Sequence, residues 1–190
     1  MKKANRSHKK TVVDILSTSF DDNTSMNYMV KQDRKRRDRI RHLMDYCFEV
    51  CLRNGYIYMS DNEKGCILII KPECKISFFV RWYLYLKVIV RSIGIANLPK
   101  VIRRESTLKK FHPSGLHYYL WLIGVFPEHQ NKGIGTKLLE DSIAECDQSK
   151  RPMFLETSVE RNIPLYERFG FKVFSKVDFG YMMYVMKRKA

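Results

Sequence analysis

Six residues near the middle of the chain have the composition of a phosphate-binding loop, Gln130-Asn131-Lys132-Gly133-Ile134-Gly135. They follow an apolar run at 117–125 and precede a stretch with helical periodicity. The first N–H groups of a helix have no partner within it, and the helix dipole adds partial positive charge there. Glycines let an anion approach the backbone because they carry no Cβ. The loop therefore predicts a site for the phosphates of a ligand.

Two common phosphate-binding loops do not fit these residues. The P-loop needs Gly-Lys-Ser or Gly-Lys-Thr, and neither tripeptide occurs in the sequence. The dinucleotide-binding loop of Rossmann proteins needs a third glycine where Leu138 stands. The loop instead matches Gln/Arg-x-x-Gly-x-Gly/Ala, with Gln130, Gly133 and Gly135 at the defining positions.

A buried strand and an amphipathic helix are expected to position this loop. Residues 117–125 are apolar on both alternating faces, as in a strand that is covered on both sides. Pro127 has no N–H to donate, so strand pairing should stop there. Beyond the loop, one helical face carries Gly135, Leu138, Leu139, Ser142, Ile143 and Cys146.

A second motif lies downstream of the first. Residues 153–157 form a β-rich run, and Asn162 is followed by Tyr166-Glu167-Arg168-Phe169-Gly170-Phe171. In this order, the two motifs resemble the acetyl-CoA loop and the Asn…Tyr-Glu-x-x-Gly-Phe segment of the GNAT (GCN5-related) N-acetyltransferases. The resemblance covers about residues 115–186, and an ordinary strand–helix unit with a glycine turn is the alternative. It implies an α/β fold in which helices flank a mixed, mostly antiparallel sheet that is splayed at its central strands.

The resemblance also implies acetyl-CoA as a cosubstrate, with no metal. Backbone N–H groups would hold its pyrophosphate at Gln130, Asn131, Lys132, Gly133, Ile134, Gly135 and Thr136. Backbone groups of Ile123, Gly124 and Val125 would hold the pantetheine arm, and the Val125 N–H would polarise the acetyl carbonyl. Asn162 either contacts the cofactor or caps the following helix. The Lys132 side chain either adds charge to the site or points into solvent.

Three side chains are candidates for the chemistry of acetyl transfer, which needs a neutral amine, a stabilised oxyanion and a proton for the thiolate. Tyr166 aligns with the family tyrosine often assigned as general acid, and a phenol of pKa about 10 is protonated at neutral pH. Its alternative role is packing beside the sulfur. Glu156, within an otherwise apolar strand, is the candidate base, and the alternative is a carboxylate bound to backbone or to Arg161. His117, at the start of the central strand, is the second candidate base.

The predicted function is transfer of an acetyl group from acetyl-CoA to a primary amine by direct attack in a ternary complex, with the amine unidentified. One alternative is a non-catalytic acyl-CoA-binding member of the family. Another is a nucleic-acid-associated protein, because the net charge is +15 and residues 31–41 contain seven basic side chains that could bind phosphates. A solvated helix face is the other interpretation of that run.

Composition predicts one domain over residues 1–190, as a monomer or homodimer. A chain of 190 residues can build a core, and 45% hydrophobic residues argue against disorder. The five cysteines are odd in number and lack C-x-x-C spacing, which favours reduced thiols in a cytoplasmic protein. Buried packing of Cys47 and Cys51 is favoured over a metal site that would include His42.

Other patterns predict the remaining elements. These are helices at 11–20 and 34–53, a hairpin at 56–59 and 66–70, and two closing strands at 171–179 and 181–186. Asn54-Gly55 is expected to stop the second helix, and residues 187–189 are expected to fray.

Residues 76–95 form the most apolar segment of the chain. Arg81, Lys87 and Arg91 interrupt it, so no transmembrane segment is predicted. We expect an aromatic-rich helix that packs on the sheet or lines a substrate cleft, with peripheral membrane contact as the alternative. GNAT proteins place variable acceptor-binding elements before the central strand, so the resemblance assigns about residues 75–113 to the acceptor site.

Overall fold

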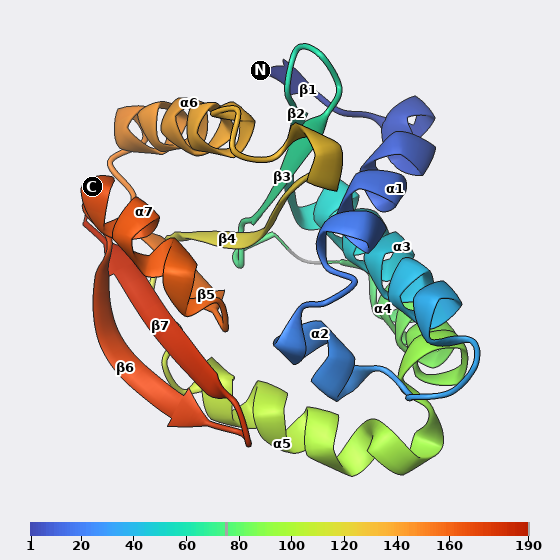
Figure 1. The fold of residues 1–190 in the computed structure, drawn as a ribbon. Coiled ribbons are helices and arrows are strands. Elements are labelled where there is room, and N and C mark those ends of the chain that lie inside the picture. The colour runs from blue at the N-terminus through green and yellow to red at the C-terminus, as the bar shows by residue number, and fades with distance from the viewer. Residues whose placement is uncertain (75, 190) are drawn as a thin grey trace.

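The computed structural model describes residues 1–74 and 76–189, and within them it contains one seven-stranded sheet (Figure 1). The strand order is β1-β2-β3-β4-β5-β7-β6. Only the pair β4–β5 is parallel among these neighbours, which confirms the mixed, mostly antiparallel sheet expected from sequence. The strands are β1 (Lys2–Lys3), β2 (Gly55–Met59), β3 (Gly65–Ile70), β4 (Tyr118–Val125), β5 (Met153–Thr157), β6 (Lys172–Asp178) and β7 (Met182–Arg188).

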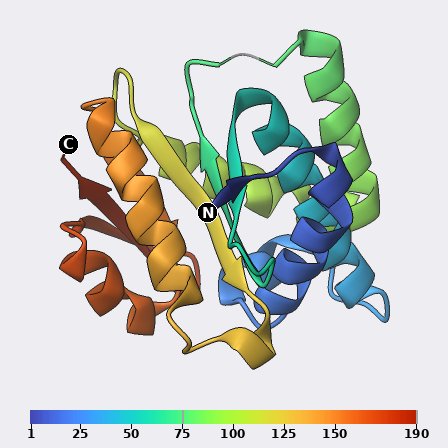
Figure 2. The ribbon, with the colours of Figure 1, turned by 90° about the horizontal axis from the view of Figure 1, so that it is seen from above.

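Helices cover both faces of the sheet. Figure 2 shows α6 on one side of β4 and α1, α3 and α4 on the other. The α-helices are α1 (Lys9–Ser19), α2 (Thr24–Met29), α3 (Arg36–Asn54), α4 (Phe78–Val88), α5 (Leu98–Lys109), α6 (Ile134–Gln148) and α7 (Ile163–Arg168). Short helical segments are η1 (Arg6–His8), the π-helix η2 (Ile89–Ile93), η3 (Ile95–Asn97), η4 (Pro127–His129) and η5 (Glu160–Asn162).

Apolar side chains buried on the two faces hold these layers together. Ile15 and Leu16 of α1 and Phe48 of α3 belong to the cluster under those helices. Leu139 of α6 and Leu155 of β5 belong to the cluster on the opposite face. Each fully buried side chain of this size contributes roughly 1.5–3 kcal/mol. The sheet is therefore fixed from both sides, and the predicted helices and strands are confirmed within a few residues of their expected ends.

Helix α3 ends at Asn54 with Gly55 as its C-cap residue, as expected from sequence, but Gly55 does not adopt the left-handed conformation of a typical glycine cap. Its φ is −165°, an extended conformation, and it begins β2. A Cβ on this residue would lie 2.0 Å from the Ile69 carbonyl oxygen in β3. The helix stop is therefore confirmed, and the close approach of β3 adds a second reason for a glycine at this position.

The C-terminal basic residues are more ordered than expected. Arg188 lies opposite Met153 in the β5–β7 ladder, and its guanidinium pairs with Asp147 and donates to the Phe169 carbonyl at 2.9 Å. The prediction of fraying is wrong for Lys187 and Arg188, because the sheet and α6 both bind this end of β7.

Helix α4 packs mainly against α3, and its Val88 belongs to the buried cluster that includes Leu68 and Leu122 of the sheet. Leu84 and Val88 are buried, while Phe78 and Phe79 are exposed to solvent. None of the helices described is long and apolar enough to cross a membrane.

The basic run at 31–41 is largely engaged within the protein. Arg36 pairs with Asp21, and Arg41 pairs with Asp14. The Arg39 guanidinium holds the pKa of the Asp33 carboxyl well below its ordinary value by hydrogen bonding to it. These pairs favour the interpretation of the run as a solvated helix face.

Four of the cysteines are buried free thiols, as their packing interpretation predicted: Cys47, Cys51, Cys66 and Cys146. Burial raises the pKa of the Cys51 thiol to about 12, so it stays protonated.

Candidate active site

The site is organised by the point at which β4 and β5 separate. These two strands pair from Tyr118–Met153 to Leu120–Leu155. Beyond that point β4 continues beside β3, and β5 continues beside β7. The edge of β4 from 121 to 125 is therefore open on the side of β5, which confirms the splay expected at the central strands.

A bulge in β4 turns backbone groups toward this opening. Leu68 lies opposite Leu122 and Ile69 opposite Leu120, so Trp121 is an extra residue. The Tyr118 N–H donates to Pro152 beside β5, whereas the Phe126 N–H donates to Lys64 beside β3. In a regular strand, the N–H groups of two residues separated by an even number of positions point to the same neighbouring strand. The N–H groups of residues 118 and 126 point to different neighbours, so the bulge reverses the direction in which the backbone groups after it point. The backbone groups of Ile123 and Val125 consequently face away from β3.

The glycine loop forms the start of α6. Asn131 and Gly133 have φ of 58° and 77°, the left-handed region that these two residue types tolerate best. The N–H groups of residues 131–136 have no hydrogen-bond partner within 1–74 and 76–189. The first turn of α6 contains no acidic residue, so nothing in that turn offsets the helix dipole. This arrangement fits a bound anion such as a pyrophosphate.

Gln130 connects the loop to the end of β4. Its backbone N–H donates to the Pro127 carbonyl at 3.2 Å, and its side-chain amide donates to the Val125 carbonyl at 3.1 Å. The row of free N–H groups therefore begins at Asn131, one residue later than the Gln130 start expected from sequence for the pyrophosphate-binding groups. Lys132 is exposed, and its Nζ donates to the Glu128 carbonyl at 2.9 Å.

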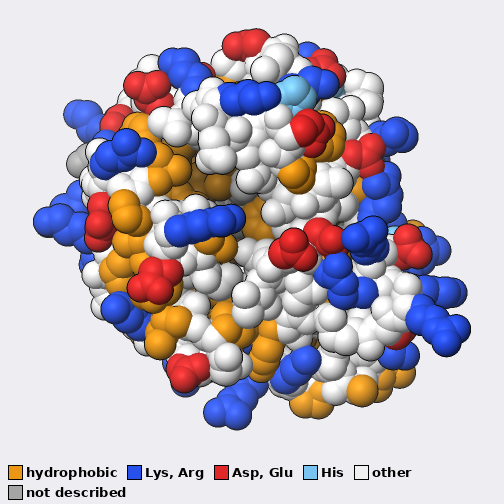
Figure 3. All heavy atoms as spheres, viewed as in Figure 1, with side chains coloured by type: hydrophobic (Ala, Val, Ile, Leu, Met, Phe, Trp, Pro, Cys, Tyr) orange, Lys and Arg blue, Asp and Glu red, His pale blue; other side chains and the backbone are white. Residues whose placement is uncertain are grey.

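Gly135 has room that the fold does not use. A Cβ on it would lie 3.6 Å from Val125 Cγ2, an ordinary contact. Thr136, Ile134 and Gly135 are half-buried at the start of α6. In the space-filling view (Figure 3), the surface between α6 and α7 is hollowed over β4, and the floor of the hollow is apolar. The loop thus opens beside a depression along the splayed strand.

Tyr166 lies on α7, on the α6 side of the sheet. It is buried with Leu155, and its ring meets Phe171 edge-on at 6.0 Å. Burial raises the pKa of its phenol to about 12, so the hydroxyl is protonated under ordinary conditions. Asn162 stands at the N-cap of α7 but its side chain makes no capping hydrogen bond, so the capping alternative is wrong. Its contact with a cofactor stays a prediction.

Glu156 lies on the opposite face, where its carboxylate contacts a histidine. Glu156 Oε1 is 3.0 Å from His112 Nε2, and Arg161 is not its partner as the alternative had it. Glu156 and burial together raise the pKa of the neighbouring Tyr119 phenol, with burial the larger cause. The His112 ring packs on Phe154 at 4.7 Å. A carboxylate and an imidazole are therefore held in hydrogen-bond contact beside β5.

His117 belongs to the same cluster but does not touch Glu156 directly. Its ring centroid lies 6.4 Å from that of His112. His117 Nδ1 is 2.9 Å from the Gly115 carbonyl, which fixes the proton on Nδ1, while the buried Nε2 has no partner among the described residues. The structure thus brings Glu156 and His117 to one face and Tyr166 to the other.

Two residues of this region carried no signal in the sequence. His112 lies in the polar stretch after α5, where neither periodicity nor a motif marks it. Ser19 ends α1, and its Oγ lies 3.4 Å from the Val125 nitrogen, at the open edge of β4. Only the fold brings both to the site. No group of three or more His, Cys, Asp or Glu side chains within 1–74 and 76–189 is placed to hold a metal ion.

The profile of the Acetyltransferase (GNAT) family matches residues 70–171, which include β4, the glycine loop, α6, β5 and α7. The chain belongs to the GNAT acetyltransferase family. The matched range contains every residue proposed from sequence for the cofactor or for the chemistry. Members of this family use acetyl-CoA as the acetyl donor.

Individual relatives agree with this GNAT assignment. An uncharacterized N-acetyltransferase of Schizosaccharomyces pombe is 44% identical over 54 residues, which are 28% of this chain and 22% of the relative. The match thus spans about a fifth of that relative's length.

Solved structures share the GNAT fold over the whole chain. The structure of histone acetyltransferase HPA2 and related acetyltransferase from Corynebacterium glutamicum is 21% identical, with a TM-score of 0.76, over 100% of this chain and 95% of that one. The NatC complex bound to Gag peptide and CoA is 14% identical, with a TM-score of 0.56, over 100% and 96%. At these identities the likeness establishes the fold alone.

Proposed function

We propose that this GNAT protein transfers the acetyl group of acetyl-CoA to a primary amine by direct attack in a ternary complex. The observation that carries the proposal is the open edge of β4, which leads to the free N–H groups of residues 131–136. One strand thereby offers backbone hydrogen bonds to an extended arm, and one helix start offers them to a pyrophosphate.

The cosubstrate would be held mostly by backbone. Residues 131–136 would take the pyrophosphate, and Ile123, Gly124 and Val125 would take the pantetheine arm. The Val125 N–H, now 3.4 Å from Ser19 Oγ, would turn to the acetyl carbonyl and stabilise the oxyanion. Bound acetyl-CoA supplies an activated thioester carbonyl.

The chain's side chains would handle the protons. The amine nitrogen attacks the carbonyl carbon, the C–S bond breaks, and the departing sulfur takes a proton from the Tyr166 hydroxyl. The amine loses its proton to Glu156, directly or through His112, which lies 3.0 Å from the carboxylate. Tyr166 and Glu156 lie on opposite faces of β5, so proton delivery and proton removal occur on different sides of the strand.

The acceptor would enter on the face that carries Glu156. That face is bounded by α5 and by the turn before β7, and buried Arg104 of α5 donates to the Tyr181 hydroxyl at 2.9 Å and to Ser25 Oγ at 2.9 Å. Within the expected acceptor region at about 75–113, α5 and the loop to His112 approach this face. Helix α4 belongs to the same region of the sequence but packs against α3, so the proposal assigns it no contact with the acceptor.

The cofactor part is tested by thermal unfolding with acetyl-CoA. A ligand that binds only the folded state stabilises it by about 2.7 kcal/mol at 100 times its Kd. Gly135→Glu should abolish the rise in Tm, because a side chain and a negative charge would occupy the pyrophosphate position. Gln148→Glu is a matched control for the one added negative charge, since Gln148 is exposed at the opposite end of α6. An unchanged Tm rise in Gly135→Glu contradicts the assignment of the loop.

The transfer itself is tested by incubating acetyl-CoA with a library of amines and following the release of free thiol. Amine-dependent thiol release supports catalysis. Binding of acetyl-CoA without release by any amine class would identify the protein as a non-catalytic member of the family.

A further inference from the structure

The outward side of α4 and of the η2 turn that follows it carries a stripe of exposed apolar side chains beside Arg81. We call it the α4 face, and it consists of the exposed residues Phe78, Phe79, Trp82, Tyr83, Leu86 and Val90. Their spacing of i, i+1, i+4, i+5, i+8 and i+12 puts them on one stripe of a helix. Phe79 is 82% exposed and Val90 is 70% exposed. Contiguous apolar surface of this kind marks an interaction site in folded proteins.

The surroundings of the α4 face are strongly basic. Residues 76–95, which include α4 and η2, contain three basic side chains and no acidic one: Arg81, Lys87 and Arg91. Lys87 is paired with Asp45, whereas Arg81 and Arg91 are exposed at the margins of the face. Two copies of such a surface would repel each other, while a negatively charged surface would be attracted. The charge pattern therefore opposes self-association through this face and favours an anionic partner.

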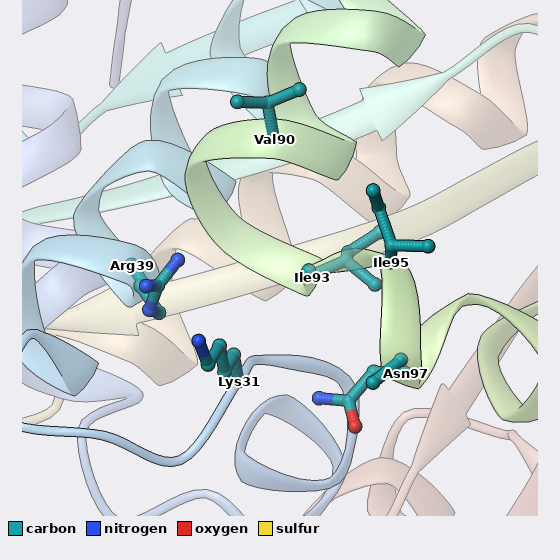
Figure 4. A pocket seen from close by; sticks show the side chains of 8 residues that line it. Lys31, Arg39, Val90, Ile93, Ile95 and Asn97 are labelled. Atoms are coloured by element: carbon teal, nitrogen blue, oxygen red, sulfur yellow. The ribbon is translucent and has the colours of Figure 1, made fainter.

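A cavity of about 360 Å³ adjoins the α4 face at Val90. Figure 4 shows the nitrogens of Lys31 and Arg39 on one side of it and Ile93, Ile95 and Val90 on the other. The π-helix η2 ends here at Gly94, whose φ of 76° turns the chain sharply. Asp33 is the acid next to both cations, 3.6 Å from Lys31 Nζ and hydrogen-bonded to Arg39. Two cations and one carboxylate leave this wall with one net positive charge, and the opposite wall is apolar.

We propose that the α4 face docks on the surface of a lipid bilayer that contains anionic phospholipids. Trp, Tyr and Phe side chains occupy the headgroup level of membranes, and exposed cations beside them bind anionic headgroups. The cavity beside Val90 fits a lipid phosphate against Lys31 and Arg39, with the acyl chains following the apolar wall. Nucleic acid is a poorer match, because its phosphate backbone offers no apolar surface to Leu86 or Val90.

Docking in this orientation leaves the GNAT cleft accessible to water. Figure 2 shows α4 at the outer edge of the molecule, on the other side of the sheet from α6. No residue of the α4 face or of the adjoining cavity belongs to the glycine loop or to the Glu156 cluster. The proposal is therefore independent of the proposed acetyl transfer, and the two can fail separately.

The experiment is cosedimentation of the full chain with vesicles of phosphatidylcholine alone and with vesicles that contain phosphatidylglycerol. We expect binding to the anionic vesicles that weakens with added salt. Leu86→Glu should lower this binding about tenfold or more, because it places a charge on the inserted surface. Leu116→Glu is the matched control, since Leu116 is 55% exposed and Leu86 57%, and it should bind as the wild type does.

A second arm removes the charges and leaves the apolar face intact. Each cation near an anionic membrane contributes about fivefold to binding, so Arg81→Ala combined with Arg91→Ala should lower it roughly 25-fold. Circular dichroism checks that each variant is folded.

Three results overturn the proposal. The first is absent or equal binding to both vesicle types. The second is concentration-dependent dimerisation that Leu86→Glu abolishes, which would make the face a self-interface. The third is single-stranded RNA binding that Leu86→Glu weakens while vesicles remain unbound.

Discussion

Strand β4 has two edges, and they differ in how much of their length is paired with a neighbouring strand. On the β3 side, pairing runs from Tyr119–Ile70 to Val125–Gly65 with one bulge. On the β5 side, pairing stops at Leu120–Leu155. The first edge belongs to the fold, whereas beyond Leu120 the second edge pairs with no strand among residues 1–74 and 76–189. We infer that unused hydrogen-bonding capacity locates the ligand more reliably than any single side chain does.

Glycines on the two sides illustrate the same difference. Gly55 lies in the fully paired part of the sheet, and a Cβ there would lie 2.0 Å from the Ile69 carbonyl oxygen. Gly135 lies at the open side, and a Cβ there would make an ordinary contact at 3.6 Å. One glycine is required by a neighbouring strand, and the other has space that the protein itself leaves empty.

The largest expected effect comes from Gly55→Ala. The added methyl must push β2 and β3 apart, which should lower the free energy of unfolding by about 3 kcal/mol or more. Gly135→Ala should change it by less than about 1 kcal/mol while weakening acetyl-CoA binding. Urea unfolding and titration with acetyl-CoA measure the two quantities. Equal losses of stability in the two variants would remove the distinction between the edges.

Tyr166→Phe tests whether the open side carries chemistry as well as binding. We expect turnover to fall about 10²-fold, the usual scale for losing a general acid, with acetyl-CoA affinity changed by no more than about threefold. Burial raises the pKa of Tyr166 to about 12, so the loss of rate caused by its ionisation should appear near pH 12 and not near 10. Full activity in Tyr166→Phe would exclude the phenol from proton transfer.

A smaller effect should separate the candidate bases. Glu156→Gln keeps the hydrogen-bonding capacity but cannot take a proton, so turnover should fall about tenfold near neutral pH and recover as rising pH supplies neutral amine. His112→Gln should reproduce part of this change if the imidazole relays the proton, and His117→Gln should change the rate modestly. The pH–rate profiles of the three variants decide the assignment. A low-pH limb that survives in Glu156→Gln and disappears in His117→Gln would make the histidine the base.

Sequence predicted the fold and the position of the glycine loop at the start of α6, because those features are local. The glycine loop, the helix face that follows it and Tyr166 all lie within a short segment with fixed spacing. Periodicity also predicted α1, α3 and the β2–β3 hairpin, since amphipathic burial leaves its mark in the order of residues.

The acceptor half could not be predicted in the same way. Glu156 is bound by His112, which is 44 residues distant in sequence, and Val125 is bound by Ser19, which is 106 residues distant. Gly55 was predicted to stop α3, which it does, but its close contact with β3 has no mark in the local sequence. The exposure of the aromatic residues of α4 could not be predicted from sequence, because apolar residues usually face inward.

Because of the bulge at Trp121, the number of residues in β4 should be more strictly constrained than their types. Deleting one residue there would restore regular alternation and turn the N–H groups of Ile123 and Val125 toward β3. It would also rotate Leu122 out of the core beneath α1. Homologues should therefore vary the residue types between His117 and Gln130 far more freely than their number.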